Sequence, residues 1–326
     1  MLFSRRRAAA GLLALAGAAL PASPAFAQPM PDLSSADDAP TQFDAGRDAF
    51  EHLMAPVTIN GRGPFQFLMD TGANVSCVSR DLAERLGLSA LPPARVHTVV
   101  GVRERPGVLI ETLQVGERRR RGVHAAALNL DKGLDGVLGV DWLDGQRLEM
   151  GFKAKSLAIT RSKADVAREG AVAVIPARRR FGQLTIVDAD LGGRRINAMI
   201  DSGSQLTICN SALRSMVSAA NRRSGDSDEY KRVGMETLLG ETFSGELIYL
   251  PFMRLGGLQL GNVPVVYSEM HVFDLWGLKD KPAVVLGMDL LTQFDTVALD
   301  FGRSQVRFDL AQSQMLGPAK RGPVAV

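Results

Sequence analysis

The stretch FLMDTGANV, residues 67–75, recurs 131 positions later as AMIDSGSQL, residues 198–206. In each copy an apolar, strand-like run ends at an aspartate, Asp70 or Asp201, and a hydroxyl residue and a glycine follow directly. A single Asp-x-Gly after a strand is an ordinary turn. Two copies in matching surroundings indicate an internal duplication in which each half contributes one carboxylate.

Further shared segments follow the two aspartates in the same order. VLGVDWL, residues 137–143, matches VLGMDLL, residues 285–291, and Leu-Gln-x-Gly occurs at residues 113–116 and again at 258–261. The second half is longer, and its polar residues 221–230 are typical of a surface loop that holds much of the extra length. The common order predicts two structurally equivalent halves.

On these motifs the chain resembles retropepsin-like aspartic proteases, with both lobes fused in one chain, over roughly residues 55–310. The resemblance implies an all-β fold with two pseudo-two-fold-related β-barrel lobes, short helices, and an active site between the lobes. We expect residues 172–175 to form a strand of a sheet shared by the lobes. The expected division is a signal peptide at 1–27, a flexible leader at 28–42, an N-terminal lobe at 43–160, an inter-lobe connection at 161–182, a C-terminal lobe at 183–312 and a tail at 313–326.

Two neighbouring aspartates can perform a reaction that a lone aspartate cannot. One ionised carboxylate takes a proton from water while the other, still protonated, hydrogen-bonds the carbonyl oxygen of a peptide bond. Two carboxylates held close together cannot both ionise cheaply, so the pair shares a proton. We therefore expect Asp70 and Asp201 to be the catalytic residues.

The residues next to the aspartates are expected to support this dyad. By the resemblance, the hydroxyls of Thr71 and Ser202 bond across to the opposite loop. Gly72 and Gly203 allow a close backbone approach that a Cβ atom would block. The Leu-Gly steps at 138–139 and 286–287 are expected to pack beneath the dyad.

Three interpretations concern polar residues farther along these motifs. Ala73 offers no side-chain hydrogen bond, whereas Ser204 can donate one to Asp201 and favour its ionised form. We therefore expect Asp201 to be ionised and Asp70 to hold the proton. The aspartates that follow the Leu-Gly steps, Asp141 and Asp289, are expected to cap helices, and Ser79 is expected to cap a short helix over residues 79–86.

Two hairpins are expected to act as flaps that contact the substrate. The first covers residues 95–113 and turns near Val100 and Gly101, and the second covers residues 235–250 and turns near Leu239 and Gly240. All three tyrosines lie in the second half, so the tyrosine of the first flap of pepsin-like enzymes has no counterpart. The chain is therefore more similar to a fused retroviral-type dimer.

The first 27 residues have the features of an export signal. Residues 5–7 are arginines, residues 8–20 are mildly apolar, and Ala25-Phe26-Ala27 is a small-residue cleavage pattern. The start, SRR at residues 4–6, resembles a twin-arginine signal, although alanines follow it. The pattern predicts a periplasmic or otherwise exported protein; an uncleaved membrane anchor is the alternative. No other apolar run is long enough to span a membrane, so no stable membrane insertion is expected after cleavage.

Composition argues against several other classes of function. The chain has 38 basic and 35 acidic residues, and removal of the three signal arginines balances the charge. Basic residues 118–121 lack interleaved aromatic residues and are read as a solvated hairpin, so nucleic acid is not an expected partner. The four histidines lack zinc-site spacing and no phosphate loop occurs, so we expect no metal and no cofactor. Cys77 and Cys209 are expected to be small buried residues. The sequence leaves undecided whether they form a disulfide, which an exported protein permits.

The sequence thus predicts an exported aspartic endopeptidase that is active as a monomer. Its expected partner is a protein or peptide substrate, an extended segment of another envelope protein bound as a strand between the flaps. The alternative is a catalytically silent peptide-binding or scaffolding protein on the same fold. The presence of both hydroxyl residues and both glycines argues against the alternative, because a binding module does not need them.

Overall fold

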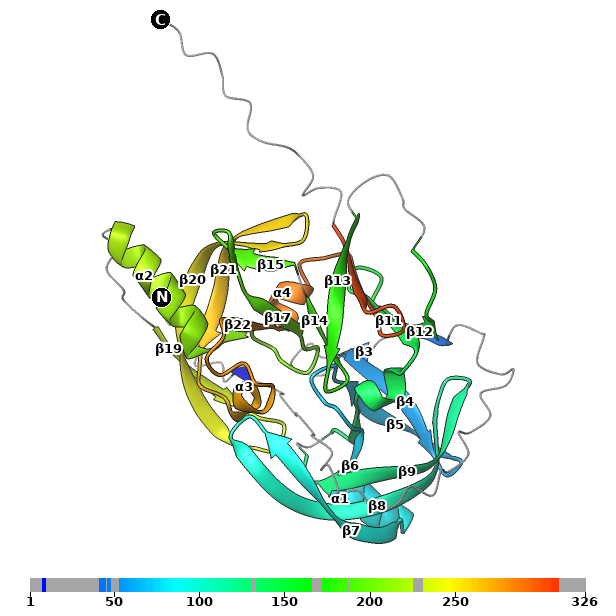
Figure 1. The fold of residues 1–326 in the computed structure, drawn as a ribbon. Helices are drawn as coiled ribbons and strands as arrows, with labels where there is room; N and C mark the ends of the chain where they lie inside the picture. Colours follow the sequence, from blue (N-terminus) through cyan, green and yellow to red (C-terminus); the bar gives the residue numbers. More distant parts are fainter. Residues whose placement is uncertain are drawn as a thin grey trace, which may run out of the picture.

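The computed structural model describes residues 8–9, 41–44, 46–47, 53–130, 133–165, 172–186, 188–224 and 231–310. Strands dominate these residues, and the chain forms two β lobes in succession together with a sheet to which both contribute (Figure 1). The predicted all-β, two-lobed fold is confirmed. The predicted signal cleavage site, most of the leader and the tail at 313–326 lie outside the described residues.

The first lobe is an eight-stranded sheet in the order β3-β4-β5-β10-β6-β9-β8-β7, and an added pairing of β4 with β8 closes it into a barrel. Its helix α1 (Arg80–Leu86) begins after Ser79, whose side chain accepts the Leu82 N–H at 3.1 Å, so the predicted helix cap is confirmed. The strands are β3 (Gly46–Arg47), β4 (Leu53–Ile59), β5 (Arg62–Met69), β6 (Cys77–Ser79), β7 (Ser89–Thr98), β8 (Gly101–Val115), β9 (Arg118–Leu128) and β10 (Gly136–Leu138), and a 3-10 helix, Val140–Leu143, follows β10.

The second lobe repeats the pairings of the first. The strand before each aspartate lies parallel to the strand that carries Leu-Gly, β5 beside β10 and β17 beside β22. The lobe contains strands β14 (Gln183–Ile186), β15 (Ala189–Leu191), β16 (Arg194–Arg195), β17 (Asn197–Ile200), β18 (Ile208–Cys209), β19 (Lys231–Glu236), β20 (Thr242–Leu255), β21 (Leu258–Tyr267) and β22 (Ala283–Leu286), and helices α2 (Ser211–Ser224), α3 (His271–Leu275) and α4 (Met288–Leu291). Strand β1 (Ala8–Ala9), within the predicted signal, pairs in parallel with β19.

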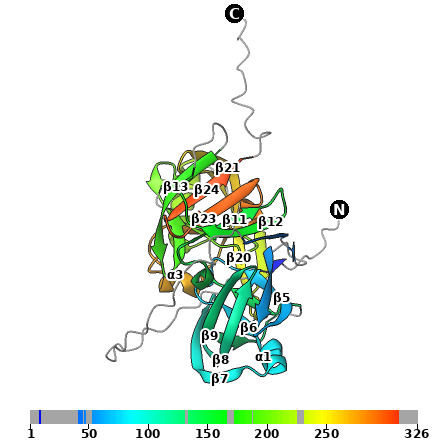
Figure 2. The ribbon, with the colours of Figure 1, turned by 90° about the vertical axis from the view of Figure 1, so that its right-hand side faces the viewer.

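A sheet built from both halves joins the lobes on one side of the molecule (Figure 2). Its order is β13-β24-β23-β11-β12-β2. These strands are β2 (Thr41–Asp44), β11 (Gln146–Gly151), β12 (Ser156–Arg161), β13 (Val172–Arg180), β23 (Thr296–Asp300) and β24 (Gln305–Asp309). Residues 172–175 pair with β24, so the predicted shared-sheet strand is confirmed. Because β13 continues into pairing with β14, the shared sheet is hydrogen-bonded directly to the second lobe.

One predicted correspondence between the halves is wrong. In the first lobe, Leu113 lies near the end of β8, whose residue Val115 pairs with Arg118 at the start of β9. In the second lobe, Leu258 is itself the first residue of β21 and pairs with Leu255. The two Leu-Gln-x-Gly segments therefore occupy different places in their lobes. The predicted loop at residues 221–230 is also wrong at its start, since residues 221–224 form the end of α2.

The arginine run at residues 118–121 is only partly solvated. Arg118 is buried, donates to Trp142 O at 3.1 Å, and places its guanidinium over the Trp142 ring. Arg120 also lies over this ring and donates to Asp141 O. Two arginines of the run therefore make cation–π contacts with Trp142 on the first lobe. The sequence pattern alone did not indicate these contacts.

Both cysteines are buried and neither forms a disulfide. Cys77 lies opposite Val137, whereas Cys209 lies opposite Val284, one position away from the equivalent Val285. They pack as small apolar residues behind the Asp loops, which confirms the predicted burial. Within the described part of the chain, none of the helices has the length and apolar character that a membrane crossing requires.

Candidate active site

Each aspartate stands at the point where a strand ends beside its parallel neighbour. Asp70 follows β5 and donates its N–H to Leu138 O at 3.0 Å, and Asp201 follows β17 and donates its N–H to Leu286 O at 3.1 Å. Each loop is held a second time, by the Val140 N–H to Ala73 O and by the Met288 N–H to Ser204 O, both at 2.8 Å. The Leu-Gly steps thus fix the backbone of the two Asp loops by hydrogen bonds as well as by packing.

The hydroxyl residues bond across the lobe boundary, as the resemblance implied. Thr71 Oγ1 donates to Ile200 O and accepts the Ser202 N–H, both at 3.0 Å. Reciprocally, Ser202 Oγ donates to Met69 O at 2.7 Å and accepts the Thr71 N–H at 3.1 Å. These four buried bonds tie the Asp loops of the two halves to each other.

The glycines lie directly against the opposite carboxyl group. A Cβ atom on Gly72 would clash with the carboxyl of Asp201, and a Cβ atom on Gly203 would clash with that of Asp70. Only glycine therefore allows the two loops to come this close. The arrangement brings together the two carboxyl groups that the sequence places 131 positions apart.

The dyad is buried and hydrogen-bonded by the backbone. Asp70 is 0% and Asp201 1% exposed. Asp70 Oδ1 accepts the N–H groups of Gly72 and Ala73 at 2.7 and 3.1 Å, and Asp201 Oδ1 accepts the Gly203 N–H at 2.8 Å. Burial, followed by the charge of Asp201 and a hydrogen bond to it, raises the pKa of Asp70 well above its usual value, against the two backbone bonds.

The predicted hydrogen bond from Ser204 to Asp201 is not made. The Ser204 hydroxyl donates its one hydrogen to Leu206 O, at 2.8 Å. The reason given for Asp201 as the ionised partner is therefore wrong. The raised pKa of Asp70, which follows from burial and the neighbouring charge, agrees with a pair that shares one proton.

Asp141 and Asp289 do not cap helices, because the N-cap positions belong to Gly139 and Gly287. Asp141 instead accepts the Ser76 hydroxyl at 2.9 Å, and Asp289 accepts the Thr207 hydroxyl at 2.7 Å. These two supporting pairs brace the far ends of the Asp loops. A signal was available in the sequence, since each hydroxyl residue lies six positions after its dyad aspartate.

The predicted flap residues lie at the tips of two hairpins. The first flap consists of β7, β8 and the turn at residues 99–100, and the second consists of β19, β20 and the turn at residues 237–241. Val100 is 40% exposed and Gly101 opens β8, while Leu239 packs on apolar residues of the first lobe beside the turn glycine Gly240. The predicted tip residues are thus at the tips, but they are not the most buried ones.

The sequence analysis missed the residues that anchor the tips. Val99 is 2% exposed and belongs to an apolar cluster of the second lobe that includes Phe273 and Trp276. Leu238, in the equivalent place, is buried in an apolar cluster of the first lobe. Each flap thus docks on the other lobe. The repeated pattern Thr-apolar-apolar-Gly, at residues 98–101 and 237–240, could have revealed this equivalence.

Gln183 was also missed, and it reaches the Asp70 loop from the second lobe. Its side chain is 1% exposed, and Nε2 donates to Gly72 O and, at 2.9 Å, to Asn74 Oδ1. The peptide group that carries Gly72 O carries the Ala73 N–H at its other end, which bonds Asp70 Oδ1 at 3.1 Å. A donor on the carbonyl polarises this peptide and strengthens the N–H bond to the carboxylate.

We expect Gln183→Met to lower kcat about tenfold with little change in KM. The variant keeps the approximate volume but removes a buried hydrogen bond, and a loss of about 1.4 kcal/mol corresponds to tenfold in rate. The matched control is Gln146→Met, since Gln146 is another buried glutamine but lies in the shared sheet. Equal kcat values for the two variants would show that Gln183 does not support the dyad.

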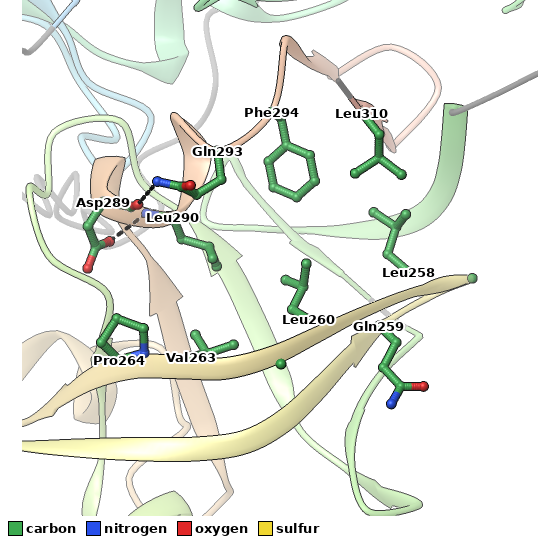
Figure 3. A pocket seen from close by; sticks show the side chains of 12 residues that line it. Leu258, Gln259, Leu260, Val263, Pro264, Asp289, Leu290, Gln293, Phe294 and Leu310 are labelled. Atoms are coloured by element: carbon green, nitrogen blue, oxygen red, sulfur yellow. Dashed lines mark hydrogen bonds between the residues drawn. The ribbon is translucent and has the colours of Figure 1, made fainter. Parts of the chain in front are cut away.

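A separate cavity of about 580 Å³ lies on the second lobe, between β21, α4 and Leu310. The side chains of Leu258 and Leu260, both on β21, point toward Phe294 and Leu310 across it (Figure 3). By strand register, Leu258 and Leu260 occupy the places that Arg118 and Arg120 hold on the first lobe. On the first lobe these two arginines lie over the Trp142 ring instead. The dyad does not line it.

Metal-ligating side chains do not gather anywhere in the described ranges, where no group of three His, Cys, Asp or Glu residues could hold an ion. His97 and His271 meet as a pair between the first flap and α3. His124 is exposed on β9.

Comparison with known families agrees with this geometry. The profile described as "Aspartyl protease" matches residues 55–142 and 187–290, one segment in each half and more than half of the chain. The chain belongs to the aspartyl protease family and carries two retropepsin-like lobes in one polypeptide. Among curated proteins, none matches the chain.

Proposed function

We propose that this member of the aspartyl protease family is an exported endopeptidase that hydrolyses peptide bonds with Asp70 and Asp201. The observation that carries the proposal is the pairing of the two Asp loops. Their hydroxyls bond across the lobe boundary, and each glycine lies against the opposite carboxyl. A binding module would gain nothing from two buried carboxyl groups that must share a proton.

The chemistry follows from the shared proton. Asp201, ionised, takes a proton from a water molecule whose oxygen attacks the peptide carbonyl carbon, while protonated Asp70 donates to the carbonyl oxygen. A tetrahedral diol results. Its collapse breaks the C–N bond as a proton passes to the leaving nitrogen, and the products are a carboxylic acid and an amine. The dyad ends with one proton again, ready for another cycle.

The endopeptidase assignment rests on the symmetry of the site. Two equivalent hairpins, one from each lobe, dock their tips on the opposite lobe. A peptide held between them would meet similar surroundings on both sides of its scissile bond. A peptide that extends on both sides of its scissile bond fits such a site, and the hairpin strands offer it main-chain hydrogen bonds. A segment of another exported protein is the substrate class that we propose.

The pH dependence follows from the raised pKa of Asp70. The dyad works only while it holds one proton, so activity lies between the two pKa values of the pair and is lost as the pH rises through the upper one, that of the proton-holding group. Since burial and the charge of Asp201 raise this pKa, the alkaline limb of activity lies above the usual range of an aspartate.

Digestion of an unbiased peptide library by the full-length or processed protein, between pH 4 and 7, tests the function. We expect internal cuts flanked by residues on both sides, with activity falling toward neutral pH. Release of single residues from peptide ends would contradict endopeptidase action. Retention of peptides without any cleavage would instead favour a silent binding protein.

Export rests on the signal-like residues 1–27 alone, since their cleavage site lies outside the described residues. Sequencing the N-terminus of protein from the cell envelope tests it. A start at Gln28 would support processing, and a start at Met1 would contradict it.

A further inference from the structure

The first flap is held down on the second lobe by three kinds of contact at its tip. The His271 N–H, at the start of α3, donates to Val99 O at 2.8 Å. His97 Nδ1 and His271 Nε2 lie 3.2 Å apart, and their rings stack with centroids 5.4 Å apart and an interplanar angle of 12°. The Val99 side chain is buried among apolar residues of the second lobe. Figure 1 shows the β7–β8 hairpin ending beside α3.

The second flap closes over the first lobe in the same way. Leu238 is buried among first-lobe residues, and Arg103 Nε on the first flap lies 3.8 Å from Glu241 Oε1 on the second. With both flaps in these positions, Asp70 and Asp201 are 0% and 1% exposed. The dyad carboxyls are therefore closed to a peptide in this arrangement.

We propose that His97 and His271 form a proton-sensitive latch that holds the first flap shut near neutral pH and releases it in acid. The proposal concerns regulation of the site described above and rests on the proposed function. It goes beyond that function because it assigns a role to two residues that take no part in the reaction.

A hydrogen bond between two imidazole nitrogens needs one proton between them, so the pair is held when it is neutral or singly protonated. Protonation of both rings turns both facing nitrogens into donors and places two positive charges at contact distance. The bond is then lost and the rings repel each other. Acid therefore acts directly on the contact that joins the flap to α3.

On the first flap, nearby positive charge also disfavours protonation of His97. Arg95 on β7 and Arg103 on β8 are the nearby cations of the first flap, while Asp274 on α3 and Glu241 on the second flap are anions. Glu241 is already paired with Arg103. Burial, then His271 and Arg95, lower the pKa of His97 below its ordinary value.

The sign of the effect follows from linkage. His97 binds a proton less readily in the closed flap than it would in an open, solvated flap, so opening takes up a proton. The closed form is fully favoured above the ordinary histidine pKa and loses its advantage as the pH falls through it. The ratio of open to closed protein rises by up to about tenfold per pH unit for each proton taken up. The same acid range supplies the proton that the dyad needs.

Hydrogen exchange of the His271 backbone N–H, measured on the full chain without substrate, tests the latch. This N–H is bonded to Val99 O only while the flap is closed. After correction for intrinsic exchange, we expect its protection to fall between pH 7.5 and pH 5 in the wild type, by up to about tenfold per pH unit below the ordinary histidine pKa. His97→Gln, whose amide can still bond His271 but cannot be protonated, should keep most of its protection at pH 5.

The control is His124→Gln, which removes a histidine outside the latch and should behave as the wild type. His271→Gln keeps the backbone N–H and should reproduce the result of His97→Gln if that variant folds poorly. Protection that does not change with pH in the wild type, or an equal loss in the glutamine variants, would overturn the proposal. Because no substrate is used, the latch can fail while the protease activity stands, and the activity can fail while the latch stands.

Discussion

Asp70→Asn and Asp201→Asn are each expected to lower kcat for peptide hydrolysis by roughly 10³- to 10⁴-fold, while the protein still folds. The amide keeps the size of the carboxyl group but can neither take a proton from water nor return one, so the general acid–base contribution is lost. Both carboxyls are buried and must share a proton, so a neutral group is tolerated in either position. Steady-state kinetics on a cleaved library peptide and a thermal melt measure the two effects.

Asp300→Asn is the matched control for these variants. Asp300 is also a buried aspartate, but it lies on β23 of the shared sheet and accepts the Ser162 hydroxyl at 2.6 Å. Its replacement is expected to lower the melting temperature and leave kcat within a factor of about two to three. A dyad variant that kept near wild-type kcat would rule out the shared-proton mechanism, even if the control behaved as expected.

The fold and the placement of the dyad follow from local patterns in the sequence. The strand that ends at Asp-Thr/Ser-Gly and the strand that ends at Leu-Gly are each recognisable from a few adjacent residues. Each motif also occurs twice, which makes a chance match less credible. Since Asp70 bonds Leu138 O and Asp201 bonds Leu286 O, the two motifs are parts of one hydrogen-bonded unit in each lobe. Residues within such a unit can be found without a structure.

Contacts between units cannot be found in this way, and the cross-lobe bonds of Thr71 and Ser202 were expected only from the family resemblance. Val99 and Leu238 look like ordinary apolar residues of a hairpin, and their burial depends on the lobe that each flap meets. Gln183 lies far in sequence from the Asp70 loop that it contacts. The predicted hydrogen bond from Ser204 to Asp201 was wrong for a simpler reason. The Ser204 hydroxyl has one hydrogen, and it donates that hydrogen to the nearby Leu206 O. Donor choice among close acceptors depends on backbone geometry that a motif does not specify.

Thr71→Val is expected to reduce the free energy of unfolding by about 3 kcal/mol and kcat by about 100-fold. Valine fills the same space without the hydroxyl, so Ile200 O and the Ser202 N–H are left buried without their partner, and each such group costs about 1–3 kcal/mol. Activity falls as well, because the two Asp loops are no longer held in register, and a displacement of about 1 Å can cost a factor of about 100 in rate.

Thr71→Ser separates the role of the oxygen from that of the methyl group. Serine already performs the equivalent task at Ser202, where its hydroxyl bonds Met69 O at 2.7 Å and accepts the Thr71 N–H at 3.1 Å. The serine variant is therefore expected to stay within about 1 kcal/mol of the wild type and to keep most of its kcat. Urea denaturation and kinetics on the same peptide compare the three proteins. If the valine and serine variants unfold at the same urea concentration and turn over at the same rate, the cross-lobe hydroxyl bonds do not hold the dyad in place.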